Sequence, residues 1–75
     1  MCTFVAFDGQ SGTEVQIATG LTTKEECAYK VYNEHPRATG ATFGIIGQSD
    51  AGKCWAEFGS KTLSASTVYT FCYLP

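Results

Sequence analysis

The sequence predicts an α+β domain in which a single helix packs on a small antiparallel sheet of about five strands, stapled by disulfides. Three observations lead to this prediction. One stretch has helical periodicity between a cap signal and a proline, several short stretches are rich in β-branched and aromatic residues, and four cysteines are spread along the 75 residues. A chain of this length makes one domain, residues 1–75, whose core is too small to hold without covalent or metal support.

The helix is predicted over residues 22–34, TTKEECAYKVYNE, and Pro36 ends it because the residue before a proline disfavours the α region. Two overlapping capping-box spacings open it, each able to satisfy the first backbone N–H groups. They are Thr22 with Glu25 and Thr23 with Glu26. Glu26 and Lys30 are expected to form an i,i+4 ion pair. The face expected to be buried consists of Cys27, Ala28, Val31 and Tyr32.

Five stretches have strand character, two before the helix and three after it. They cover residues 3–7, 14–18, 41–46, 53–58 and 67–73. Asp8-Gly9 is a strong hairpin signal, so the first two strands are expected to pair antiparallel. In the second strand Val15 and Ile17 alternate with polar residues, which predicts that both face the core.

Three further features fall in or between the later strands. Gly44 lies inside the third predicted strand and indicates a bulge or a close approach of main chain. The segment 47–52, GQSDAG, is rich in turn residues and is expected to be a loop. The segment 59–66 is small and polar, so it is expected to be another loop, anchored by Leu63.

The four cysteines contain no Cys-x-x-Cys pair, and the only histidine is His35, which is expected to be an exposed capping residue. A zinc site usually takes its ligands in close pairs, so we expect neither a metal nor another cofactor. Four cysteines allow three pairings, and geometry favours joining the helix to the strand beneath it and the first strand to the last. The predicted bridges are Cys27–Cys54 and Cys2–Cys72.

Two disulfides imply an oxidising compartment and a secreted protein, although the opening MCTFVAFDG has no signal-peptide character. Free buried cysteines in a cytosolic protein are the alternative. The net charge is −2 and the five basic residues are scattered, which argues against nucleic acid and anionic lipid as partners. No apolar run approaches the ~20 residues of a membrane span.

Four segments together resemble a PAN/apple-type module. They are LTTKEECAYKVYNEHP for the capped helix, GKCWAEFG for the central strand, and MCTF and YTFCYL for the two bridged ends. The family usually has a second helix cysteine, where this chain has Val31 or Tyr32, so the chain resembles a reduced, two-disulfide variant. The resemblance implies a secreted, non-catalytic recognition module that binds carbohydrate or protein, often in tandem within a larger chain.

Catalysis finds little support in the residues themselves. His35 is next to a proline at the end of the predicted helix, and a cysteine nucleophile would need a free thiol. Asp50 and Glu57 could form a carboxylate pair, but seven scattered acidic residues make such a coincidence common. We therefore expect that the protein is not an enzyme.

The predicted ligand site is centred on Trp55, with Glu57 two residues along the same strand face. Trp55 and Glu57 lie opposite Cys54 if the strand is regular. The neighbouring loop adds Gln48, Ser49 and Asp50. An aromatic ring stacks on the apolar side of a pyranose while polar groups bind its hydroxyls. In the alternative, which the pattern favours slightly, Trp55 is a minor core residue.

The aromatic stripe of the last strand leaves the same choice between core and exposed patch. Its members, Tyr69, Phe71 and Tyr73, share one face. Two function classes remain open: a lectin-like adhesion module that binds carbohydrate or a glycoprotein, and a structural protein that self-assembles through its sheet edges into homo-oligomers. A small protease inhibitor comes third, because no rigid binding loop stands out.

Overall fold

One helix and six strands make up the fold in the computed structural model, which describes residues 2–10, 12–59 and 62–75. In chain order they are β1 (Phe7–Gln10), β2 (Thr13–Ala18), α1 (Lys24–Glu34), β3 (Gly40–Gly44), β4 (Cys54–Phe58), β5 (Thr62–Ala65) and β6 (Tyr69–Tyr73). The predicted α+β class, with one helix on an antiparallel sheet, is confirmed. Within the described ranges, no helix is long and apolar enough to cross a membrane.

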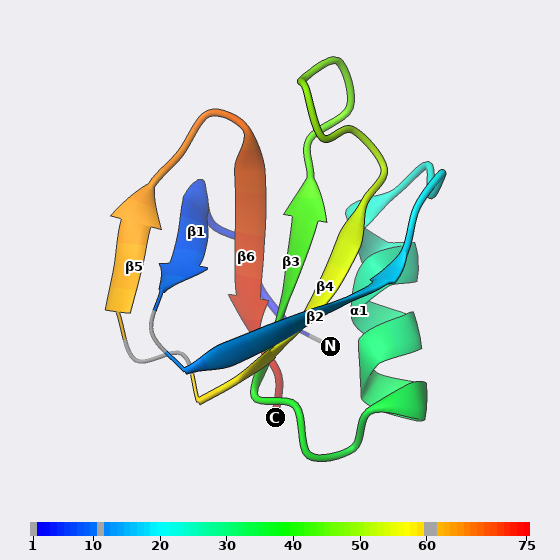
Figure 1. Ribbon diagram of the computed structural model, residues 1–75, viewed down its shortest axis with the longest axis vertical. Coiled ribbons are helices and arrows are strands. Elements are labelled where there is room, and N and C mark those ends of the chain that lie inside the picture. Colours follow the sequence, from blue (N-terminus) through cyan, green and yellow to red (C-terminus); the bar gives the residue numbers. More distant parts are fainter. Residues whose placement is uncertain (1, 11, 60–61) are drawn as a thin grey trace.

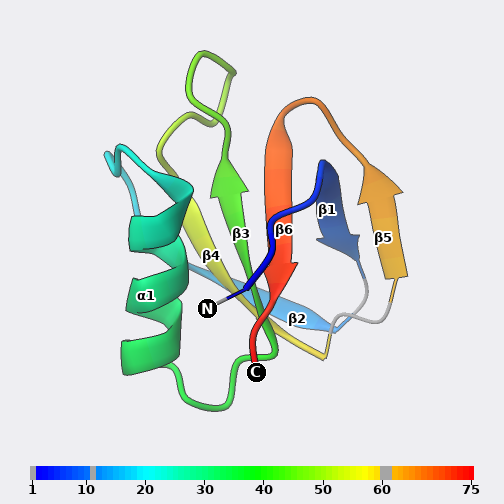
Figure 2. The ribbon, with the colours of Figure 1, turned by 180° about the vertical axis from the view of Figure 1, so that it is seen from behind.

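The strands form two antiparallel sheets rather than one. The larger has four strands in the order β2-β4-β3-β6, and the smaller pairs β1 with β5. Helix α1 packs on β3 and β4, while the β1–β5 pair lies at the other end of the molecule, beside β6 (Figures 1 and 2). An isolated β-bridge between Val5 and Phe71 pairs the N-terminal segment with β6. On one face of the larger sheet the helix therefore covers β3 and β4.

The helix begins at the second of the two predicted caps. The Thr23 hydroxyl accepts a hydrogen bond from the Glu26 N–H at 3.2 Å, and the Glu26 carboxylate accepts one from the Thr23 N–H at 2.9 Å. The expected Thr22–Glu25 box is wrong, because Thr22 also donates to Glu26, through both its N–H and its hydroxyl. These bonds, led by that of the Thr22 hydroxyl, hold the pKa of Glu26 below its usual value.

The expected ion pair between Glu26 and Lys30 is also wrong. The cap already occupies the Glu26 carboxylate, and Lys30 instead pairs with Glu34, Nζ to Oε2, at 2.9 Å. His35 is the C-cap, as expected, and its N–H donates to the Val31 carbonyl at 2.8 Å. It is half-buried rather than exposed, because its ring meets the edge of Phe58 at 6.3 Å.

The core lies between α1 and the sheet and is fastened by both predicted disulfides. Cys27–Cys54 joins helix to β4, and Cys2–Cys72 joins the N-terminal segment to β6, with Cα–Cα distances of 5.5 and 5.6 Å. The largest buried side chain of this core is Phe43. Its other buried members are Cys27, Ala28, Val31, Ala38, Ala41, Cys54, Ala56 and Cys72. Tyr32 is 49% exposed, which corrects its predicted burial: the buried stripe is narrow, and a residue one step beyond Val31 turns away.

The sequence prediction fails for the smaller sheet. Asp8 and Gly9 lie inside β1 rather than in a hairpin turn, and β1 pairs with β5 instead of β2. The segment 59–66 contains a strand, β5, where a loop was expected; residues 60 and 61 lie outside the described part. Three of the four β5 side chains are exposed, so its pairing rests on backbone hydrogen bonds and leaves no hydrophobic pattern to detect.

Strand β2 forms an edge of the larger sheet. Val15 is on the helix side of the sheet, opposite Ala56, yet its side chain is 50% exposed. The helix packs on β3 and β4 and does not extend over β2. Val15 is therefore left partly in solvent, and the expectation that it faces the core is wrong. Ile17, the other residue expected inward, is half-buried against the core.

Gly44 allows the loop after β3 to fold back onto the strand. A Cβ on Gly44 would overlap the carbonyl of Asp50, so the predicted close approach of main chain is confirmed. Gly44 also closes this loop through the Gly52 N–H, which donates to its carbonyl at 3.0 Å. The loop is thereby held at one end of β3 and β4.

Candidate binding face

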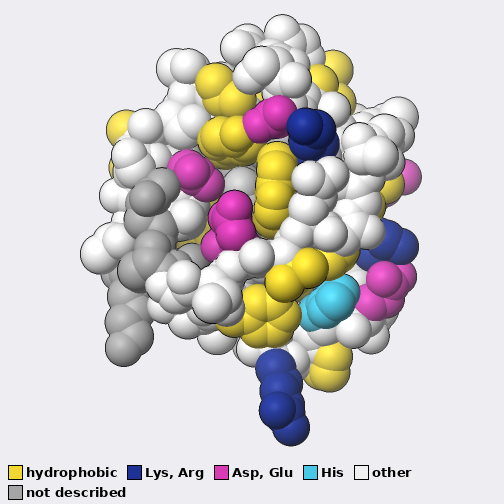
Figure 3. Space-filling model, viewed as in Figure 1, with side chains coloured by type: hydrophobic (Ala, Val, Ile, Leu, Met, Phe, Trp, Pro, Cys, Tyr) yellow, Lys and Arg dark blue, Asp and Glu magenta, His cyan; other side chains and the backbone are white. Residues whose placement is uncertain are grey.

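The face of the larger sheet that points away from α1 carries the predicted site. The register places Trp55 beside Gln16 on one side and Thr42 on the other. It places Glu57 between Glu14 and Gly40, so Trp55 and Glu57 share the face opposite Cys54, as predicted. Figure 3 shows this face, where acidic and hydrophobic side chains lie side by side over β4, β3 and β6.

Trp55 and Tyr69 form an aromatic pair on this face. Their ring centroids are 5.5 Å apart and the rings are almost perpendicular, at 84°. Edge-to-face pairs of this kind contribute ~0.5–1.5 kcal/mol beyond their burial and fix the orientation of both rings. Both side chains are half-buried, which leaves part of each ring open to solvent. Trp55 therefore has features of both predictions made for it: it packs against Tyr69, as a core residue would, and it stays partly exposed, as a binding residue must.

Tyr69 connects this pair to the predicted loop. Its hydroxyl donates a short hydrogen bond to the Asp50 carboxylate, whose other oxygen accepts one from Lys53 Nζ at 3.0 Å. The bond to Asp50, together with burial and nearby negative charge, raises the pKa of Tyr69 to about 12. The same bond, and then Lys53, lowers the pKa of Asp50. Asp50 thus stays ionised and Tyr69 stays protonated across the physiological range.

The remaining loop residues are less closely connected. Gln48 and Ser49 are exposed, and the loop around them is held by main-chain bonds from Gln48 N–H to the Ile45 carbonyl and from Ala51 N–H to the Gln48 carbonyl, both 3.1 Å. Among the predicted site residues, the structure brings Asp50 to the aromatic pair through Tyr69. It places Gln48 and Ser49 on the same loop, exposed to solvent.

Glu57 is almost completely buried. Its side chain is 1% exposed, and one carboxylate oxygen accepts a hydrogen bond from the Thr42 hydroxyl at 2.7 Å. Phe71 is also fully buried on this side of the sheet, with its ring over Gly40, whereas Tyr73 is 51% exposed. Strand β1 contacts both β6 and β3, so it covers part of this face and leaves the Trp55 end open.

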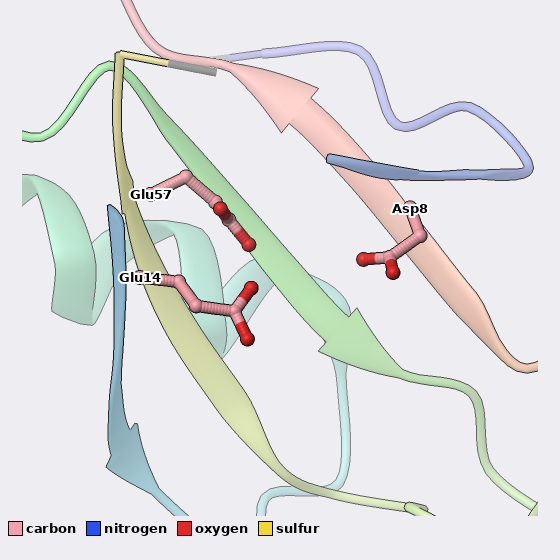
Figure 4. A group of neighbouring side chains, drawn as sticks. All are labelled: Asp8, Glu14 and Glu57. Carbon is pink, nitrogen blue, oxygen red and sulfur yellow. The ribbon is translucent and has the colours of Figure 1, made fainter. Parts of the chain in front are cut away.

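Three carboxylates lie close together where β1 crosses the face of the larger sheet that points away from α1. Asp8 from β1, Glu14 from β2 and Glu57 from β4 point toward one another, with oxygens within 4.8 Å (Figure 4). Burial, and then the charge of Glu14, raise the pKa of Asp8, while a hydrogen bond from the Gly9 backbone opposes the rise. Carboxylate oxygens suit hard cations. We assign no ion here, because Thr42 and the Gly9 backbone already engage two of the three groups.

The sequence prediction missed several members of the face. Glu14 and Gln16 alternate with Val15, and that alternation could have placed them beside Trp55 once the β2–β4 pairing was known. Tyr69 was assigned to a separate stripe, although it contacts Trp55 directly. Asp8 had no such signal, because Asp8-Gly9 is typical of a turn.

The larger depressions formed by the described residues lie elsewhere on the surface. One, of about 470 Å³, lies between the start of α1 and the end of β3 and is lined by Thr22, Thr23, Lys24, Glu25, Phe43, Ile45, Ile46 and Thr70. Another, of about 420 Å³, lies beside the end of α1 and includes Tyr32, His35 and Leu74. Neither is lined by a residue of the predicted site.

No protein-family model matches this chain, and neither a curated protein nor a solved structure is significantly similar to it. The resemblance to PAN/apple modules therefore stays a prediction from the sequence. Both disulfides are present, and all four cysteines are used in them, which indicates an oxidising compartment.

Proposed function

We propose that this protein is a secreted, non-catalytic recognition module that binds carbohydrate, free or on a glycoprotein, through the open end of the face around Trp55. One observation supports the proposal most strongly: the Trp55–Tyr69 pair is partly exposed beside polar groups and is fixed by the bond from Tyr69 to Asp50. Aromatic rings held in one orientation beside hydrogen-bonding groups suit the alternating apolar and hydroxyl surfaces of a sugar.

The polar groups around the pair indicate which sugars fit. Asp50 contributes a carboxylate with a lowered pKa, and Gln16 lies next to Trp55 with an exposed amide. Glu14 adds a second carboxylate, which is exposed and lies two residues from Gln16 along β2. These groups favour neutral or amino sugars, whose hydroxyl or ammonium groups donate, over acidic sugars, which the carboxylates repel. Glu57 is buried beneath this surface, so its contribution is indirect, through its hydrogen bond with the Thr42 hydroxyl.

A glycan array on the oxidised protein tests the proposal, followed by titration calorimetry with the strongest sugar. Trp55→Ala should reduce affinity at least about tenfold, Trp55→Phe should retain part of it, and Tyr69→Phe should weaken it by freeing Asp50. Tyr29→Ala is the matched control, because Tyr29 is an aromatic residue 58% exposed on the helix, away from the face. Failure to bind any glycan, or an equal loss in the control, would refute the proposal.

A structural, self-assembling role is the second candidate. It is favoured by one observation, the open edge of β2, where Val15 is half-exposed. The solution mass of the protein, measured without any sugar, tests this role: assemblies larger than a dimer favour it, whereas a monomer or a dimer is compatible with the binding module.

A further inference from the structure

Strand β2 has a partner on one side only. It is the first strand in the order β2-β4-β3-β6, and of the described elements β4 is the one it packs against closely. Its residues, TEVQIA, include no lysine, arginine or proline, which are the residues that commonly protect an edge strand from pairing with another chain. Its side chains are exposed from Thr13 to Gln16.

The hydrogen bonds of the neighbouring strands determine which backbone groups of β2 point outward. Gly44 donates to the Lys53 carbonyl and accepts from the Gly52 N–H, so its backbone groups face β4. Backbone direction alternates along an antiparallel pair, and the register then makes Thr42 and Trp55 a hydrogen-bonded pair. The groups of Ala56 consequently face β2.

Ala56 is opposite Val15, so the Val15 N–H and carbonyl point inward to β4. The N–H and carbonyl groups of Glu14 and Gln16 must then point outward, along the open edge. This gives four backbone groups, two donors and two acceptors, spaced as an antiparallel partner strand requires.

We propose that two copies of this chain pair antiparallel through the β2 edges, about a two-fold axis at Val15, and form a continuous eight-stranded sheet. Glu14 of each copy lies opposite Gln16 of the other, and these pairs exchange four backbone hydrogen bonds. The two Val15 side chains, each 50% exposed in the single chain, meet in the close, non-hydrogen-bonded position.

Charge and geometry select this register among its neighbours. An axis at Glu14 would place two like carboxylates directly opposite each other, which is unfavourable. An axis at Gln16 would pair Glu14 with Ala18, across the irregularity between Gln16 and Ala18 that interrupts the ladder. With the axis at Val15, the one charged residue of β2 faces a neutral amide that can accept or donate.

The dimer has a consequence that rests on the proposed function. The two-fold axis is perpendicular to the sheet, so both copies present their Trp55 faces on the same side. The two Trp55 residues lie three strand spacings apart across the sheet and two residues apart along the strands. Combined at right angles, these separations amount to about 16 Å. A polysaccharide with several repeating units could occupy both faces at once, which raises its apparent affinity.

Sedimentation equilibrium without any sugar tests the dimer, because its outcome does not depend on carbohydrate binding. Edge pairing buries a small area, so a reversible monomer–dimer equilibrium is expected, with the dimer detectable by ~1 mM protein. Amide exchange by NMR adds a test on the unaltered chain. The Glu14 and Gln16 amides should become more protected as concentration rises, while the Val15 amide is protected throughout. A monomer at ~1 mM, or unchanged Glu14 and Gln16 amides, would overturn the proposal.

Charge variants at the axis test the register itself. Val15→Asp and Val15→Lys should each lower dimer affinity at least about tenfold, because like charges then meet across the axis. An equimolar mixture of the two should regain the dimer. Gln16→Pro deletes an outward N–H while keeping the β4 ladder, and Gln16→Ala, which keeps that N–H, is its control. A dimer whose affinity is unchanged by Val15→Asp, Val15→Lys and Gln16→Pro forms elsewhere and contradicts the pairing.

Discussion

The two faces of the larger sheet are built from the same strands and differ in almost everything else. Residues of β3 and β4 that face α1 are apolar or disulfide-bonded, such as Ala41, Phe43 and Cys54. Their neighbours on the other face include Thr42 and Glu57, both 1% exposed and joined by a hydrogen bond. The first face holds the domain together through burial and covalent bonds. The second face buries the Glu57 carboxylate and leaves the rings of Trp55 and Tyr69 partly exposed to solvent.

The two faces should therefore tolerate substitution differently. A substitution facing the helix removes apolar contacts from a core in which every neighbour is also buried. A substitution at the Trp55 end of the other face alters groups that already contact solvent. If stability and recognition are divided in this way, variants of the two faces should separate in unfolding experiments and in binding experiments.

Removing a disulfide from the helix-side core should produce the largest effect. On the chain-entropy model, Cys2→Ala with Cys72→Ala should destabilise the protein by about 4.4 kcal/mol, and Cys27→Ala with Cys54→Ala by about 3.5 kcal/mol. Guanidinium denaturation of each double variant measures the loss. Peptide mapping of the parent without reductant checks the connectivity, and a Cys2–Cys27 peptide would contradict the fold.

A direct comparison of one aromatic residue from each face comes next. Phe43 is 3% exposed against the helix, so Phe43→Ala should reduce the free energy of unfolding by about 3–4 kcal/mol. Trp55→Ala should cost less, about 2 kcal/mol, because the ring is partly exposed and loses its buried part together with the contact with Tyr69. Urea denaturation of the two variants provides the measurement. Equal losses would mean that Trp55 belongs to a core and that the two faces are not divided.

A smaller effect is expected from the buried hydrogen bond between Thr42 and Glu57. Thr42→Val keeps the shape of the side chain but deprives the Glu57 carboxylate of its hydroxyl donor, which should cost about 2 kcal/mol. Thr70→Val is the control, because the Thr70 hydroxyl bonds to the Val5 carbonyl at the surface and its loss should cost under about 1 kcal/mol. Similar midpoints for the two variants would show that this bond does not stabilise the fold.

The sequence allowed prediction of the features that leave a periodic or covalent signal. The helix, its Thr23 cap and the disulfides of Cys27 and Cys2 followed from spacing and facing positions. The β1–β5 pair did not, because its strands carry few buried side chains and Asp8-Gly9 is a usual turn signal. Short edge pairings are set by tertiary context rather than by local propensity.

The candidate site was predictable in part for the same reason. Alternation along β4 placed Trp55 and Glu57 together, and this needed only the strand itself. The contact with Tyr69 and the burial of Glu57 depend on strand order and on β1 crossing the face. Strand order is a long-range property, and no spacing within a single strand encodes it.

The smallest expected effect lies outside both faces, at the exposed start of α1, and it tests whether local capping acts independently of them. Thr23→Ala removes the acceptor for the Glu26 N–H and should destabilise the protein by about 1 kcal/mol at neutral pH. That bond involves no titrating group, so most of its loss should persist in acid. Thermal melts of the variant at neutral and acidic pH provide the measurement.

Glu26→Gln should behave differently with pH. Because the folded-state pKa of Glu26 is lowered, its carboxylate stabilises the fold above its unfolded pKa, near 4.5, and this contribution disappears as pH falls through the lower folded value. The variant should therefore melt below the parent at neutral pH and converge with it in acid. Glu25→Gln is the control, since Glu25 lies one residue earlier and takes no part in the cap. A pH-independent difference for Glu26→Gln, or an equal one for Glu25→Gln, would show that the capping charge does not stabilise the helix.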